Sequence, residues 1–197
     1  MIGNILLVFL LIYFAVAFAL PTYRVWKRTG VNPVTFHGAD TAHDYIGKLF
    51  KIVMLGLTLV VIIYAFAPNY QSFLLPVSWL EKDTVQIVGI CLLIISLGWT
   101  VAAQIQMGNS WRIGIDEEKQ TALVQAGLFR RSRNPIFLGM VVTLIGVFLT
   151  IPNGLTLLFL VLGFVLIQIQ VRLEEEFLLK THGANYDDYR RTVRRWL

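Results

Sequence analysis

Five long apolar runs, nearly free of charged side chains, constrain the fold of this chain more than any other feature. They cover Ile2–Leu20, Ile46–Ala67, Val85–Ile105, Ile136–Ile151 and Leu155–Val171. A helix needs about 20 apolar residues to cross the roughly 30 Å hydrocarbon core of a membrane, so the first three runs are long enough. The last two, of roughly 16 and 17 residues, lie at the low edge of that range. They can still cross where the bilayer thins or where the rest of the protein caps the helix ends.

The composition agrees with a membrane protein. Hydrophobic residues make up 56% of the chain and charged residues 15%, and the mean hydropathy is +0.67. Since no water satisfies backbone groups in lipid, the spans must be helical. We therefore expect an all-α integral membrane protein with five transmembrane helices, the last two forming a short hairpin that turns at 152–154. The first run is expected to be a retained span that stops at Pro21, because no small-residue cleavage site follows it.

The distribution of positive charge predicts the orientation. Sixteen of the 17 Lys and Arg residues lie in the Leu20–Ile46 loop with the start of the second span, in the Gln106–Pro135 loop, or in the tail that follows Val171. Only Lys82 falls on the other side. By the positive-inside rule, the loops and the tail are cytoplasmic and the N-terminus is outside.

The predicted partner of the basic residues is the lipid bilayer, whose anionic headgroups account for the net charge of +5. The basic residues come with no stacking platform or groove-reading motif, so we expect no nucleic acid partner. His37, His43 and His182 are scattered without the spacing that binds zinc, so we expect no metal.

The polar residues that flank the hairpin indicate a site. Arg133-Asn134-Pro135 precedes it and Glu174-Glu175-Glu176 follows it, so an antiparallel pair brings both groups to the same side. Pro135 suits the first position of a helix, with Asn134 as the N-cap whose side chain bonds exposed N–H groups. A cap alone would explain the first group, and ion pairs with the arginines at 130–133 would explain the glutamates. A ligand site is compatible with both explanations.

Two further segments belong to the same side. Residues 108–133 alternate turns with short apolar pieces, a pattern that can supply backbone groups to a ligand or simply pack as a loop on the helix ends. After the glutamates, Gly183 breaks the helix, and Tyr186 and Tyr189 recur at helical spacing. This pattern predicts a C-terminal amphipathic helix over the cytoplasmic end of the bundle.

Together these pieces resemble the family of isoprenylcysteine carboxyl methyltransferases and membrane phospholipid methyltransferases. The resemblance rests on Gly108-Asn109-Ser110-Trp111, the segments 123–129 and 133–139, and Glu174-Glu175 followed by Leu178, Gly183, Tyr186, Tyr189 and Arg194. It covers about residues 85–197. It therefore divides the chain into an N-terminal two-span region, 1–84, and a methyltransferase-like catalytic region, 85–197.

The resemblance implies a membrane enzyme that uses S-adenosylmethionine and methylates a lipophilic or small acceptor, such as an isoprenylcysteine-like carboxylate, a phospholipid amine or a thiol. By position, the cofactor would be bound by Asp116, Thr121, Ala122, Leu123, Val124, Phe129, Asn134, Pro135, Ile136, Phe137 and Glu174. Gln170 stands where the family typically has an arginine that touches substrate, so Gln170 and Arg172 are both expected to bind substrate, and Arg172 is also expected to have a catalytic role. Glu175 or Glu176 would be the general base for acceptors that need one.

Departures from the family pattern bear on the substrate more than on the reaction. Asn134 replaces the histidine of the usual Arg-His-Pro, and Phe129 replaces a common tyrosine. Two alternatives remain: a membrane reductase of related fold that uses NADPH, and a non-catalytic membrane scaffold. The retained polar residues on both sides of the hairpin favour a functional pocket over the scaffold.

Overall fold

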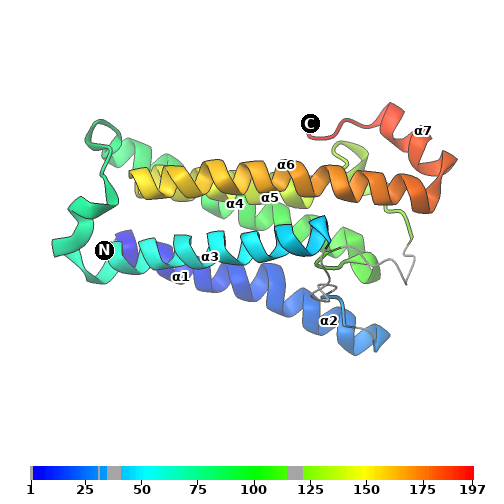
Figure 1. The fold of residues 1–197 in the computed structure, drawn as a ribbon, viewed down its shortest axis with the longest axis horizontal. Coiled ribbons are helices and arrows are strands. Elements are labelled where there is room, and N and C mark those ends of the chain that lie inside the picture. The colour runs from blue at the N-terminus through cyan, green and yellow to red at the C-terminus, as the bar shows by residue number, and fades with distance from the viewer. Residues whose placement is uncertain (1, 31, 35–40, 115–121) are drawn as a thin grey trace.

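The structure is a computed structural model, which describes residues 2–30, 32–34, 41–114 and 122–197. Its long helices run side by side along one axis of an elongated bundle (Figure 1). The α-helices are α1 (Ile2–Phe14), α2 (Leu20–Thr29), α3 (Ala42–Phe66), α4 (Asp83–Met107), α5 (Pro135–Thr150), α6 (Gly154–His182) and α7 (Ala184–Thr192). Short 3-10 helices cover Pro68–Leu74, Ser78–Leu80, Gly108–Ser110 and Gly127–Arg130. Among the described residues, β-pairing is confined to two isolated bridges.

Four helical stretches are long and apolar enough to cross a membrane: Ile2–Thr29, Ala42–Phe66, Asp83–Ser110 and Gly154–His182. Many of their large apolar side chains point outward, as a lipid-facing surface requires. The all-helical membrane protein is thereby confirmed. α5 is apolar but has only 16 residues, so the count of five spans stays a prediction.

The hairpin differs from the expected pair of short helices. α6 continues for 29 residues, through Arg172 and the three glutamates, and ends where Gly183 adopts a φ of 52°. Charged residues with long side chains are good helix formers, so the charges end the apolar run at Val171 without ending the helix. At 1.5 Å per residue the helix is about 43 Å long, which exceeds the roughly 30 Å hydrocarbon core. We therefore place Glu174 beyond the apolar, membrane-spanning part of α6.

The expected stop at Pro21 is wrong, because the first helix continues to Thr29. A π-helical turn, Ala15–Ala19, lies just before the proline, and the N–H of Leu20 bonds the carbonyl of Ala15 five residues back. Pro21 has no N–H to offer the carbonyl of Ala17, four residues back. Gln104 of α4 donates its side-chain amide to that carbonyl instead, at 2.6 Å. A proline inside an apolar helix is tolerated when a neighbouring helix satisfies the freed carbonyl in this way.

One hydrophobic core joins the two sequence regions. It takes Leu6 from α1, Leu57 from α3, Leu93 from α4, Leu144 from α5 and Ile167 from α6. Both regions therefore bury apolar surface against each other, and the division at residue 84 stays a prediction about function.

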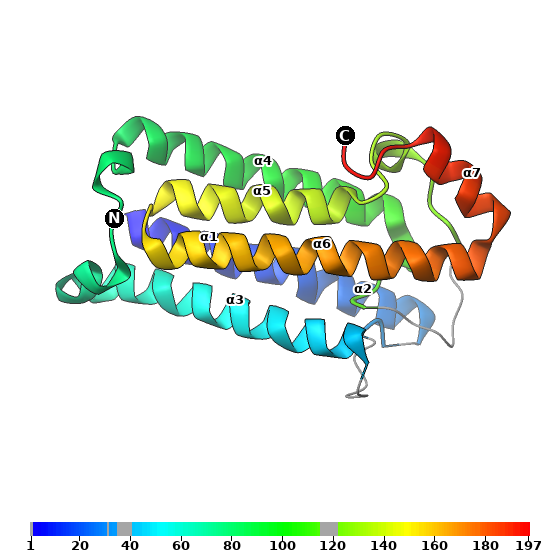
Figure 2. The ribbon, with the colours of Figure 1, turned by 45° about the horizontal axis from the view of Figure 1, so that its top comes forward.

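The bundle has two different ends (Figure 2). One end carries the connection between α3 and α4 and the turn between α5 and α6. The other carries α2, the starts of α3 and α5, the end of α6, and α7. Asn134 and the glutamates meet at this second end, as the antiparallel hairpin predicted. We call it the polar end; the orientation of the bundle in a membrane stays a prediction.

Candidate functional site

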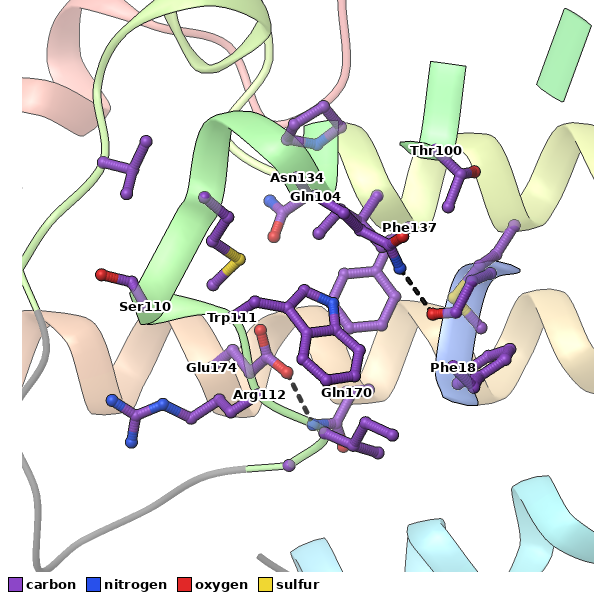
Figure 3. Close-up of a pocket in the computed structure, with 18 of the residues that line it drawn as sticks. Phe18, Thr100, Gln104, Ser110, Trp111, Arg112, Asn134, Phe137, Gln170 and Glu174 are labelled. Carbon is purple, nitrogen blue, oxygen red and sulfur yellow. Dashed lines mark hydrogen bonds between the residues drawn. The ribbon is translucent and has the colours of Figure 1, made fainter. Parts of the chain in front are cut away.

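A cavity of about 420 Å³ extends from the polar end into the interior of the bundle. Its walls come from the first helix, α3, α4, the segments that follow α4, the start of α5 and the polar part of α6 (Figure 3). The volume lies within the range of small-molecule sites, and apolar side chains dominate the lining, with a few polar groups. The cavity is therefore the candidate site.

Glu174 supplies a carboxylate at the polar end of this cavity. The side-chain amide of Gln170 donates to Glu174 Oε1 at 3.0 Å and lies 3.2 Å from Nδ1 of His43. Burial raises the pKa of Glu174 to about 7, although the hydrogen bond from Gln170 and the charge of Arg112 act in the opposite direction. The carboxyl therefore changes its charge near neutral pH.

Aromatic side chains and fixed backbone groups enclose the same end. Trp111 and Phe129 are both buried and line the cavity. The hydroxyl of Tyr189, on α7, donates to the carbonyl of Phe129 at 2.6 Å. The hydroxyl of Ser110 donates to the carbonyl of Ala122 at 3.1 Å. This bond links the short 3-10 helix Gly108–Ser110, which follows α4, to the segment that contains Ala122. The tail and two loops thus hold this wall in place.

Asn134 occupies the predicted N-cap position of α5, but its side chain makes no capping hydrogen bond. Its amide nitrogen donates instead to Glu175 Oε1 at 3.0 Å and to the carbonyl of Arg195 at 3.3 Å. Hydrogen bonds to a carboxylate are about twice as strong as neutral ones, which explains why the amide turns toward Glu175. The predicted capping bond is therefore wrong, and the position is correct.

Glu175 is held by two arginines. Arg133 Nη2 lies 3.1 Å from one carboxylate oxygen and Arg195 Nη2 lies 2.8 Å from the other. Burial acts to raise the pKa of Glu175, but the hydrogen bond from Arg195 and the charge of Arg133 outweigh it and hold the pKa below its usual range. Glu175 is also absent from the cavity lining. This geometry confirms the ion-pair interpretation for this glutamate, and its expected role as a general base stays a prediction.

Arg172 is also absent from the cavity lining, and its expected substrate contact and catalytic role stay predictions. Its side chain is exposed and donates to the carbonyl of Gln168 at 2.6 Å and to the Gln168 side chain at 3.0 Å. Residues two apart on a helix point about 200° from each other, so Arg172 cannot share the face of Gln170. Gln170 itself is buried and lines the cavity.

Most of the other predicted site residues come together. The cavity lining includes Ala122, Leu123, Val124, Phe129, Asn134, Pro135, Ile136, Phe137, Gln170 and Glu174. Asp116 and Thr121 lie outside the described residues. The contact of these residues with a cofactor or substrate stays a prediction.

Several lining residues were not predicted from the sequence. Trp111 and Arg112 follow the Gly-Asn-Ser turn, and their aromatic and cationic side chains beside that turn were a usable signal. Others come from the first helix, α3 and α4, and include Tyr13, Phe50 and Gln104. No signal marked the apolar ones among them, because an apolar residue of a span can face lipid, core or cavity with the same pattern.

A comparison with known families decides the class of this protein. The family profile described as phospholipid methyltransferase matches residues 84–185, just over half of the chain. The chain belongs to the phospholipid methyltransferase family. The resemblance inferred from the sequence is thereby confirmed, and the protein is a membrane methyltransferase by family. No curated protein matches the chain. The first two long helical stretches, which supply part of the cavity wall, lie outside the matched residues.

Proposed function

We propose that this chain transfers a methyl group from S-adenosylmethionine to a lipophilic acceptor. The observation that carries the proposal is a cavity that joins a carboxylate and an aromatic wall at the polar end to an apolar interior. A polar cofactor and an apolar acceptor can meet in such a space without either leaving its preferred surroundings.

The residues at the polar end fit the chemistry of this cofactor. Trp111 and Phe129 offer apolar and aromatic surface to a purine ring or to a sulfonium cation. Glu174 can accept hydrogen bonds from ribose hydroxyls or from an ammonium group. The guanidinium of Arg112 suits the carboxylate of the amino acid part. Asn134 and Pro135 lie on the side where α5 begins.

When bound, the cofactor supplies a methyl group already activated by the positive sulfur. The protein then has to hold the acceptor in line with that methyl group, which is a matter of positioning. A carboxylate acceptor needs no general base. For an amine or thiol acceptor, Glu174 replaces Glu175 as the best-placed group, because it lines the cavity and its pKa is raised to about 7.

The proposal also includes the chemical class of the acceptor and the orientation of the bundle in the membrane. An isoprenylcysteine-like carboxylate, a phospholipid amine and a thiol on an apolar chain all match an interior lined by apolar residues. Nearly all basic residues lie at the polar end, so the positive-inside rule supports a cytoplasmic cofactor site and an external N-terminus.

The test is calorimetric binding of S-adenosylhomocysteine to the detergent-purified protein, with NADPH as the competing ligand. We expect micromolar binding of the nucleoside that is lost in Glu174→Ala and retained in Glu176→Ala, whose carboxylate is exposed and paired with Lys180. Binding of NADPH alone would move the protein to the reductase alternative. Binding that is equally strong in both variants would remove Glu174 from the cofactor site.

A further inference from the structure

The first helix lines the interior half of the cavity. Tyr13, Phe14, Ala17 and Phe18 face the same space as Glu174, although they lie far from it in the sequence. These four residues precede the segment that matches the methyltransferase family. One wall of the cavity is therefore formed by residues outside the segment that matches the family.

A buried hydrogen bond from Gln104 joins this wall to α4. In an α-helical register the carbonyl of Ala17 would accept from residue 21, and Pro21, which follows the π-helical turn Ala15–Ala19, has no N–H to donate. Gln104 fills that role at 2.6 Å, and both residues are buried (Figure 3). The neighbouring carbonyl of Phe18 accepts from the hydroxyl of Thr22, within the same helix. Gln104 thus provides the bond that crosses from the first helix to α4 at this turn.

The position of this bond matters because Gln104 also lines the cavity. A buried carbonyl without a donor is costly in an apolar interior, so the Gln104 amide fixes where the turn lies. π-helical turns are rare and occur frequently at functional sites. The turn, the proline and the glutamine together set the shape of the wall made by Ala17 and Phe18.

The chemistry of this half of the cavity indicates what it holds. Beyond the polar end, the lining consists of apolar and aromatic side chains such as Phe50, Met54 and Met140, with the hydroxyls of Tyr13 and Thr100 among them. Three charged lining residues, Arg112, Arg133 and Glu174, lie at the polar end, and a fourth, Lys51, follows Phe50 on α3. An acceptor would therefore place its apolar chain along the first helix and its reacting group toward Glu174.

We infer that the first helix forms the acceptor wall of the site and that Gln104 is the positioning residue that holds this wall in place. The inference rests on the proposed methyl transfer and goes beyond it, because it assigns acceptor selectivity to residues outside the family match. It predicts that loss of the Gln104 bond affects the acceptor and leaves the cofactor almost unaffected.

The experiment compares wild type, Gln104→Leu, Pro21→Ala with Gln104→Leu, and the control Gln86→Leu at the opposite end of α4. Each is loaded with S-adenosylhomocysteine and titrated with N-methyl-dioleoylphosphatidylethanolamine, N-acetyl-S-farnesylcysteine and dodecanethiol, followed by tryptophan fluorescence. Calorimetric affinity for the nucleoside and the thermal midpoint are measured for the same samples. The nucleoside affinity reports whether each variant is folded.

We expect Gln104→Leu to weaken binding of the best acceptor probe by about tenfold or more, with nucleoside affinity within about twofold of wild type. Adding Pro21→Ala restores a backbone N–H four residues after Ala17 without restoring the link to α4, so the thermal midpoint should recover while acceptor binding stays weak. A purely structural role for Gln104 predicts that both quantities recover together, and that result would overturn the inference. The inference would also be overturned if the wild-type protein bound the nucleoside but none of the three acceptor probes. Wild type that fails to bind the nucleoside would refute the proposed function instead.

Discussion

Replacing Glu175 with alanine should destabilise the polar end more than any neighbouring change. Its carboxylate accepts hydrogen bonds from Arg133, Arg195 and Asn134, at distances between 2.8 and 3.3 Å. The side chains of Glu175 and Arg133 are each only 12% exposed, and that of Arg195 is 34% exposed. Removing one partner of a buried ion pair typically costs 3–5 kcal/mol, since the remaining charge stays buried without its partner. Because Arg195 reaches solvent, we expect the lower end, about 3 kcal/mol.

The neighbouring Glu176 provides a matched control. Its carboxylate pairs with Lys180 at 2.8 Å, but the two side chains are 61% and 73% exposed. Such exposed i,i+4 pairs contribute little, so Glu176→Ala should leave the free energy of unfolding almost unchanged. The assay is reversible denaturation in mixed detergent micelles, followed by tryptophan fluorescence. A loss below about 1 kcal/mol for Glu175→Ala, or equal losses for both variants, would refute the assignment of a buried, doubly paired carboxylate.

Two further predictions concern charge and packing. If the ionised Glu174 carboxyl binds the cofactor, its pKa of about 7 predicts that affinity for S-adenosylhomocysteine rises about tenfold from pH 6 to pH 8 and then levels off. Calorimetry should show a much flatter profile in Glu174→Gln, and an unchanged rise there would contradict the assignment. Gly89→Ala should lower the thermal midpoint, because its Cβ would lie 2.7 Å from a backbone nitrogen of α5. The control Gly98→Ala should have little effect, since nothing lies within 4 Å of that Cβ, and equal shifts would argue against close packing of α4 on α5.

The ion-pair cluster around Glu175 also fixes the tail. Arg133 donates to the carbonyls of Arg190 and Val193 at 2.8 and 2.9 Å, and its own N–H donates to the carbonyl of Arg194. The residues that follow α7 are therefore bound to the segment that precedes α5. Since Tyr189 bonds the carbonyl of Phe129, the same docking holds one wall of the cavity. Glu175 thus supports the cavity wall indirectly, because its ion pairs help to hold the tail against the segment that precedes α5.

The amino-acid sequence by itself determined the features that follow from apolar length and local backbone chemistry. The apolar runs predict membrane helices, and Gly183 marks the end of α6 because glycine adopts positive φ readily. The three-residue turn brings Asn134 and the glutamates to one end, whatever the helices pack against. The order of the motifs around that hairpin was enough to indicate the methyltransferase family.

Only the tertiary structure decided which side chains face the cavity. Gln170 and Arg172 are two residues apart, and only Gln170 lines the site, because successive helix positions point in different directions. From its local sequence, Pro21 is expected to end the first helix. The helix nevertheless continues, because Gln104 on α4 donates to the carbonyl of Ala17. In a soluble helix the apolar stripe would have marked the inner face. In a membrane helix every face is apolar, so the sequence carries no such mark, and packing alone places the first helix in the wall of the site.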